Sequence, residues 1–543
     1  MKRFAHSGLA LTLAAFAACS SPQSTATVTT TPSVTPTASA SPSSAPPVAV
    51  AETPDAPFRA HAPDPQSTRA FTPPHIESFT LANGLRVLLV ERHDLPIVVT
   101  QFVTRRGGDD TPVNRAGLAT LVGTLLETGT ARLNSIQLSD AFATLGAEHG
   151  TAMSWDSGVG FVKVLAANYP AAVDLLADVI QHPAFAEDEI ERARARRLAG
   201  LQQEADSPRT LASNLAARTI YGDTHPYGRS LSGTEAGVRA ITRQDIQRFY
   251  QSHFVPADSA LIVVGDVTRA AVTPILERSF GTWRATAPRQ RPVAAPPAAA
   301  RGTARIFMID RPHAPQSAVS LAHAGVARSS RDYAAIVVMN AILGGMFSSR
   351  INLNLRERHA YTYGAGSAFQ FRHGAGPFSV GGAIVTDHTA DAVHEILEEL
   401  NRIRTSDVTA DELSLAKARI TESLPSRFET TDQTASAVSD VFAYNLPLDE
   451  YATIAQRINA VTAADVRRVA QQYLDPDHAR VIVVGDRDTV EPGLRNLHIG
   501  EIEIRDVHAE PVHAAAAGSS ASPAPGGHPA SEAPRANPRG NAH

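Results

Sequence analysis

His394 and Glu398 stand four residues apart in the segment "HEILEEL" (394–400), and His388 precedes them. Imidazole and carboxylate groups one helical turn apart are residue types that bind divalent metals such as zinc. The same segment carries apolar side chains at helical spacing, namely Val393, Ile396, Leu397 and Leu400. The spacing allows a metal site, whereas the apolar periodicity favours an amphipathic helix whose polar face meets solvent.

A second stretch of interest is "AGLATLVGTLLETGT" (116–130), which is a predicted helix. Its apolar side chains recur at helical spacing: Leu118, Leu121, Val122, Leu125 and Leu126. Thr120, Gly123 and Thr124 share the other face. One helical turn at this place could present a pair of metal ligands, yet these residues supply only two hydroxyl groups and bare backbone.

Length and composition limit what such helices can belong to. The chain has 543 residues, of which 43% are hydrophobic, and its formal net charge is −5. This length predicts two or more domains with cores of their own. The near-even charge gives no basic footprint for nucleic acid, so we expect no nucleic-acid partner. No run of about 18 apolar residues lies in the body of the chain, so we expect a soluble body.

The first residues, "MKRFAHSGLALTLAAFAACSS", have the layout of an export signal. Two basic residues come first, then a short apolar run, then small residues, which predicts a signal peptide over 1–19. Cys19 is the only cysteine, and the segment around it resembles the lipobox of bacterial lipoproteins, in which this cysteine carries the lipid. Plain cleavage after "AFA" is the alternative. We expect an exported protein of the bacterial cell envelope, in the periplasm or at the outer membrane, whose membrane contact is limited to this possible lipid anchor.

Three segments have the composition of linkers. Residues 20–73 and the tail 508–543 are rich in Ser, Thr, Pro and Ala and poor in large apolar side chains, so they are predicted to be disordered. A third segment, "APRQRPVAAPPAAARGT" (287–303), separates the body into a first half, 74–286, and a second half, 304–507.

The two halves are related in sequence. "ITRQDIQRFYQSHFVPADSALIVVGD" (241–266) aligns without gaps to "VTAADVRRVAQQYLDPDHARVIVVGD" (461–486). Each copy predicts an amphipathic helix, a turn and a β-branched strand. Each half also opens with strand-like segments. We expect two homologous α+β domains, each a mainly antiparallel sheet with helices packed on one side.

Several segments of the chain resemble the M16 (pitrilysin/insulinase) peptidase family, in its short two-domain form. The segments that resemble it are "FTLANGLRVLLVE", "NRAGLATLVGTLLETGT", "THPYGRSLSGTEAGVRAITRQDIQRFYQSHF", "LIVVGD" and "LGGMFSSRINLNLRERHAYTYGAGSAF". They occur in the family's order over about 74–507. The resemblance implies the M16/LuxS metallohydrolase-like fold.

Active members of the family bind zinc through an inverted motif, H-x-x-E-H, and a distant glutamate. The two histidines grip the ion from one helix face, and the glutamate between them takes a proton from zinc-bound water. In this chain the motif positions fall on Thr120, Gly123 and Thr124, and the third ligand falls on Gly200. These residues are not zinc ligands. Glu127 and Glu204 lie nearby in sequence, but no histidine accompanies either, so we expect no metal bound by this chain alone.

Family resemblance also implies a substrate-binding pair in the second half. In active members an arginine and a tyrosine, seven residues apart, hold the substrate, and here they correspond to Arg356 and Tyr363 in "LRERHAYTYG". A guanidinium and a phenol can together brace a peptide carbonyl as it becomes an oxyanion. The alternative is a surface arginine and a packed aromatic, and Tyr361 competes for the role.

A chain without zinc ligands but with the Arg/Tyr pair resembles one subunit of the two-chain M16 peptidases. We therefore expect a non-catalytic, substrate-binding subunit that completes the site of a zinc-bearing M16 partner acting on extended peptides. Two alternatives stay open, a structural or binding scaffold with no peptidase role, and an autonomous metallopeptidase with an atypical metal site.

Overall fold

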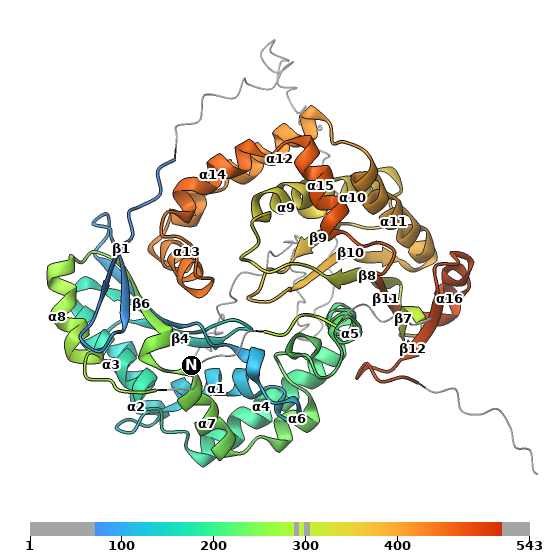
Figure 1. Cartoon of the computed structure of the whole chain (residues 1–543). Coiled ribbons are helices and arrows are strands. Elements are labelled where there is room, and N and C mark those ends of the chain that lie inside the picture. Colours follow the sequence, from blue (N-terminus) through green and yellow to red (C-terminus); the bar gives the residue numbers. More distant parts are fainter. Residues whose placement is uncertain (1–70, 287–292, 298–303, 513–543) are drawn as a thin grey trace, which may run out of the picture. The chain divides into compact units, whose positions relative to one another are not determined.

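The computed structural model describes residues 71–286, 293–297 and 304–512 (Figure 1). These residues divide into two compact units. The first contains 71–197, 231–286 and 410–462, and the second contains 198–230, 293–297, 304–409 and 463–512. Cys19 and most of the predicted linkers and tail lie outside the described residues.

Each unit is built around one six-stranded sheet. The first sheet has the order β1 (Glu77–Thr80), β2 (Arg86–Glu91), β6 (Ser259–Gly265), β3 (Ile97–Thr104), β5 (Gly158–Leu165), β4 (Glu148–Met153). The second has the order β12 (Glu501–Arg505), β7 (Ala304–Asp310), β11 (Arg480–Gly485), β8 (Gln316–Ala324), β10 (Pro377–Val385), β9 (Ala365–Phe369). The pairs β2/β6, β7/β11 and β12/β7 are parallel, and the others are antiparallel.

The helices of the described chain are α1 (Leu118–Leu125), α2 (Ser135–Thr144), α3 (Tyr169–Gln181), α4 (Glu187–Ala205), α5 (Pro208–Tyr221), α6 (Glu235–Ala240), α7 (Arg243–His253), α8 (Arg269–Phe280), α9 (Tyr333–Asn340), α10 (Arg350–Asn352), α11 (Thr389–Thr405), α12 (Ala410–Glu422), α13 (Thr431–Ala443), α14 (Glu450–Ala460), α15 (Ala463–Tyr473) and α16 (Arg487–Asn496). Helix α7 with β6, and α15 with β11, occupy equivalent places in the two orders. The predicted α+β fold with two homologous domains is therefore confirmed.

The expectation that helices cover only one side of each sheet is wrong. In β3, Val98 and Phe102 belong to a core with α1, α3 and α8, whereas Val99 and Val103 belong to a second core with α13. Successive strand side chains point to opposite faces, so both faces of this strand are buried. The uninterrupted apolar run of β6 reflects the same double burial.

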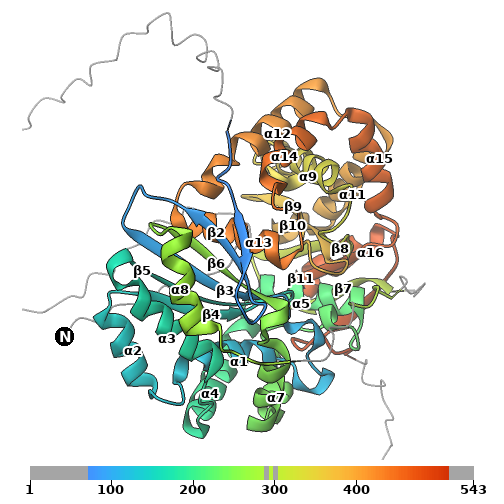
Figure 2. The same cartoon turned by 60° about the vertical axis from the view of Figure 1, so that its left-hand side comes forward.

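The helix on the second face of each sheet comes from the other half of the sequence. Helix α5 follows first-half elements in the chain but packs on β8 and β11, and α13 packs on β3 and β6 (Figure 2). The compact units therefore exchange segments and differ from the contiguous ranges 74–286 and 304–507. The physical reason is burial, because each sheet has a second apolar face that needs a cover.

One helical stretch among the described residues, Tyr333–Arg358, is long and apolar enough to cross a membrane by length and composition. In the structure 61% of its most apolar window is buried inside the protein, and a turn at 346–349 interrupts it. The stretch is therefore a core element of the second unit.

Candidate functional site

Helix α1 is shorter than the predicted segment 116–130. It begins after Gly117, whose φ of 97° lies in the left-handed region that glycine adopts without strain. It runs to Leu125, and a short 3-10 turn follows at Leu126–Thr128. Its apolar side is buried as expected, while Thr120 is half-buried and Thr124 is exposed.

The residues at the motif positions have packing roles. Thr120 Oγ1 donates a hydrogen bond to the carbonyl of Leu231 at 2.7 Å, and Thr124 Oγ1 donates to the carbonyl of Thr120 at 3.1 Å. A Cβ added at Gly123 would lie 3.1 Å from both the backbone nitrogen and Cγ of Met153 on β4. The helix therefore approaches the strand closely at the position where the family motif carries its glutamate.

These residues do not fit a zinc ion. Both threonine hydroxyls already donate to carbonyl groups, and Gly123 and Gly200, on α1 and α4, have no side chain to offer. Within the described ranges, no three His, Cys, Asp or Glu side chains form a group that could hold a metal.

Glu127 does have a histidine beside it, which the sequence did not indicate. His149 Nδ1, on β4, lies 3.6 Å from Glu127 Oε1, and its ring stacks on Phe142 with the centroids 4.0 Å apart. The pair is sequence-distant, so only the strand placement reveals it. Two such side chains are too few to form a metal centre.

Arg356 and Tyr363 lie at the two ends of a turn in the second unit. Helix α10 continues into a π-helical turn, Leu353–Arg358, and such turns are frequent at functional sites. The amide of Tyr361 donates to the carbonyl of Leu355 at 2.8 Å, and the amide of Ala360 donates to that of Arg356 at 3.1 Å. Ala360 has a φ of 56°, in the left-handed region that favours glycine.

The Arg356 side chain is 36% exposed, and its guanidinium lies over the ring of Phe347 at 4.6 Å. Phe347 is itself 65% exposed and Tyr363 is 90% exposed. An ordered turn thus presents a cation held on an aromatic face, together with a solvent-exposed phenol. Both are groups that can donate hydrogen bonds to a peptide carbonyl.

Burial separates the two tyrosines that compete for the binding role. The Tyr361 ring lies between the imidazoles of His359 and His388, with centroids 4.9 and 4.5 Å away. Burial, and then the charges of Asp391 and Glu395, raise its pKa. Tyr361 is therefore a half-buried packing residue, whereas Tyr363 is accessible.

Helix α11 carries the His394 and Glu398 pattern. Both side chains are exposed, and the apolar residues Val393, Ile396 and Leu400 are buried. His388 lies before the helix, where Nδ1 is 3.4 Å from Asp391 Oδ2. The three residues are thus not drawn together on one helix face.

A buried acidic group near α1 was missed by sequence reasoning. Asp109 is 8% exposed, and burial, with the nearby charges of Asp110 and Asp156, raises its pKa to about 7. His253 Nε2 lies 2.8 Å from Asp110 Oδ1. The only signal in the sequence is the acidic pair in "GGDD" (107–110), which by itself reads as a surface turn.

Comparisons with known proteins agree with this fold. Residues 87–235 match the family described as "Insulinase (Peptidase family M16)", and residues 240–420 match "Peptidase M16 inactive domain". The chain belongs to the M16 peptidase family.

Two relatives and one solved structure illustrate the likeness. A Mycobacterium tuberculosis protein named as an uncharacterized zinc protease is 26% identical over 74% of this chain and 92% of its own length. A probable mitochondrial-processing peptidase subunit beta of Arabidopsis thaliana is 25% identical over 80% of this chain and 83% of its own. A crystal structure of a peptidase M16 inactive domain from Pseudomonas fluorescens superposes with a TM-score of 0.70 at 25% identity, covering 76% of this chain and 98% of that one.

Proposed function

We propose that this chain is a non-catalytic, substrate-binding subunit of a heteromeric M16-type zinc endopeptidase of the cell envelope. Zinc is held by the partner subunit, and this chain supplies Arg356 and Tyr363 to an extended peptide substrate. Export and lipidation at Cys19 belong to the same proposal, and they rest on the sequence alone.

The observation that carries the proposal is the exposure of Tyr363, 90%, on a turn fixed by main-chain hydrogen bonds. Folding gains little from an aromatic ring left in water, because burial is what stabilises it. A guanidinium and a phenol held on an ordered turn can instead stabilise the oxyanion that forms during peptide hydrolysis. Tyr361, which packing accounts for, is not needed for this role.

Helix α1 supports the non-catalytic part of the proposal. The hydroxyl groups of Thr120 and Thr124 donate hydrogen bonds to backbone carbonyls, and Gly123 allows the helix to approach β4 closely. A chain of this kind needs another subunit to supply zinc. The relative named as a subunit of the mitochondrial-processing peptidase supports a role within a multi-subunit enzyme.

The first experiment is affinity purification of the tagged chain from its own envelope fraction. We expect a partner of similar size, at equal stoichiometry, that carries H-x-x-E-H and binds zinc. A partner without a metal motif, or self-association alone, would contradict the proposal and favour a scaffold. Stoichiometric zinc in the isolated chain would instead favour an autonomous metallopeptidase.

The second experiment measures turnover of a fluorogenic peptide by the purified complex. Arg356→Ala and Tyr363→Phe should each lower turnover at least about tenfold, because one oxyanion donor is typically worth about 10²–10³. Arg358→Ala and Tyr361→Phe are matched controls on the same turn and should leave turnover within about twofold. All four variants must retain their partner. Unchanged turnover in both Arg356→Ala and Tyr363→Phe would refute the role of the pair.

A further inference from the structure

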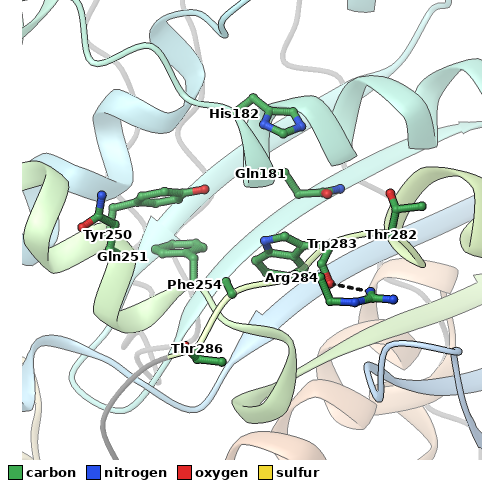
Figure 3. A pocket seen from close by; sticks show the side chains of 10 residues that line it. Gln181, His182, Tyr250, Gln251, Phe254, Thr282, Trp283, Arg284 and Thr286 are labelled. Atoms are coloured by element: carbon green, nitrogen blue, oxygen red, sulfur yellow. Dashed lines mark hydrogen bonds between the residues drawn. The ribbon is translucent and has the colours of Figure 1, made fainter.

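Two aromatic side chains at the Arg356 turn are exposed, Phe347 to 65% and Tyr363 to 90%. Aromatic rings elsewhere in the structure are packed. At the open depression where α3 and α7 end, Phe254 and Trp283 are only 2% and 8% exposed, and both belong to the core of the first unit (Figure 3). Packing fixes such buried rings. An exposed ring gains little from packing, so the backbone beneath it has to set its position.

Asn352, the last residue of α10, fixes the backbone of Phe347. Asn352 is 3% exposed, and its Nδ2 donates a hydrogen bond to the carbonyl of Phe347 at 2.7 Å. The Phe347 ring lies 4.6 Å from the guanidinium carbon of Arg356. The hydrogen bond from Asn352 therefore places the aromatic face on which the Arg356 cation rests.

The same side chain fixes the backbone that follows Tyr363. Asn352 Oδ1 accepts a hydrogen bond from the amide of Ala365, the first residue of β9, at 3.2 Å. Before Tyr363 in the chain, Thr362 Oγ1 donates to the carbonyl of Ala383 on β10 at 2.6 Å. The exposed phenol is thus carried by a short segment that is held at both ends.

One buried amide side chain therefore bonds both segments of the candidate site. Only one orientation of this amide serves both, because Nδ2 has to face a carbonyl and Oδ1 has to face an N–H group. We propose that Asn352 is a positioning residue, which holds Arg356, through Phe347, and Tyr363 in the relative geometry that binds the developing oxyanion of a peptide. This inference rests on the proposed function. Such geometry matters because a misplacement of about 1 Å can lower a rate about 10²-fold.

The test is Asn352→Leu, measured by turnover of a fluorogenic peptide by the purified complex. Leucine has the same branching as asparagine but makes neither hydrogen bond. We expect kcat to fall about tenfold or more while KM stays within about twofold, because the two donors act mainly on the transition state. Circular dichroism and equal stoichiometry with the partner show that the variant is folded and assembled. Asn352→Ala takes its place if the leucine variant does not fold.

Asn340→Leu is the matched control. Asn340, on α9, donates to the carbonyl of Ser367 at 3.1 Å and accepts from the Ser367 hydroxyl at 2.8 Å, so it also joins a helix to β9. Its bonds end two residues further along the strand than those of Asn352. The control should lose stability as Asn352→Leu does, yet keep kcat within about twofold. An equal fall of kcat in both variants would overturn the inference.

A double-variant background separates positioning from loss of stability. In a chain that carries both Arg356→Ala and Tyr363→Phe, adding Asn352→Leu should lower turnover by less than about twofold, because no donor remains to be positioned. A further tenfold loss in that background would overturn the inference. Tenfold losses in Arg356→Ala and Tyr363→Phe beside an unchanged kcat in Asn352→Leu would overturn this inference alone. Unchanged turnover in Arg356→Ala and Tyr363→Phe would refute the proposed function and this inference with it.

Discussion

Ala360 adopts a backbone conformation that is unfavourable for any residue with a side chain. Its φ of 56° lies in the left-handed region, and its amide closes the turn by donating to the carbonyl of Arg356 at 3.1 Å. A non-glycine residue pays about 1–2 kcal/mol for this conformation. Because Ala360 is exposed, no packing of its methyl group offsets the cost.

Ala360→Gly should therefore stabilise the second unit. Relief of about 1–2 kcal/mol is opposed by the greater freedom of glycine in the unfolded chain, about 0.4–1 kcal/mol, which leaves a net gain of about 0.8 kcal/mol. Ala199→Gly is the matched control, since Ala199 is exposed inside α4 in the same unit. There the same substitution should cost about 1 kcal/mol, because glycine is a poor helix former.

The assay is urea unfolding of the full chain, followed by circular dichroism, with the wild type and both variants compared under one set of conditions. The two substitutions remove the same methyl group, yet they should shift the free energy of unfolding in opposite directions. A neutral or destabilising Ala360→Gly beside a destabilising Ala199→Gly would refute the argument from backbone strain. A destabilising shift of equal size in both would point to the entropy of the unfolded chain as the source of the effect.

Three further predictions test other parts of the structure. Folding raises the pKa of Asp109 from 3.8 to about 7, so the folded state keeps a proton that the unfolded state releases, and stability falls as pH rises between these values. Asp109→Asn should thus raise the free energy of unfolding by about 1 kcal/mol or more at pH 8 and by much less at pH 4; an equal gain at both pH values would contradict the raised pKa. Gly344→Ala should cost at least about 2 kcal/mol in urea unfolding, because its Cβ would lie 2.4 Å from the backbone nitrogen of Ser367, whereas Gly364→Ala, with its nearest atom at 3.9 Å, should be tolerated. Phe347→Leu removes the ring under Arg356 and should lower turnover of the purified complex about two- to fivefold, which is the value of an exposed cation–π contact. Leu353→Ala is the control and should leave turnover unchanged. Equal effects of the two substitutions would show that the Phe347 ring acts only as an apolar side chain.

The duplication was predictable because it depends on local pattern. The gapless match of 241–266 with 461–486 already contained a helix and a strand, and the structure places them as α7 with β6 and as α15 with β11. The packing of α5 on the second sheet and of α13 on the first sheet was not predictable in the same way, because the pattern of an amphipathic helix does not indicate which sheet the helix will cover. The continuous apolar run of β6 was the available signal that a second cover existed.

In the candidate site, too, local sequence patterns predict some features and not others. Residue types alone indicated that Thr120, Gly123 and Thr124 are not zinc ligands. That Thr120 bonds the carbonyl of Leu231, or that Tyr361 packs while Tyr363 does not, depends on contacts and burial that single-sequence patterns do not contain. Asp109 was missed for this reason, because it contacts a loop distant in sequence: its amide donates to the carbonyl of Trp155 at 3.2 Å, and the charge of Asp156 lies nearby.

The two candidate elements differ in what folding alone explains. Every polar group at the motif positions of α1 has an internal partner, and Gly123 improves the contact with β4, so packing accounts for this helix completely. The Arg356 turn is the opposite case, since it keeps Ala360 in a costly conformation and leaves Phe347 and Tyr363 in water. Strain and exposed aromatic surface are kept where they serve a purpose other than stability. This contrast is the physical reason to look for binding at the turn and for zinc in a partner.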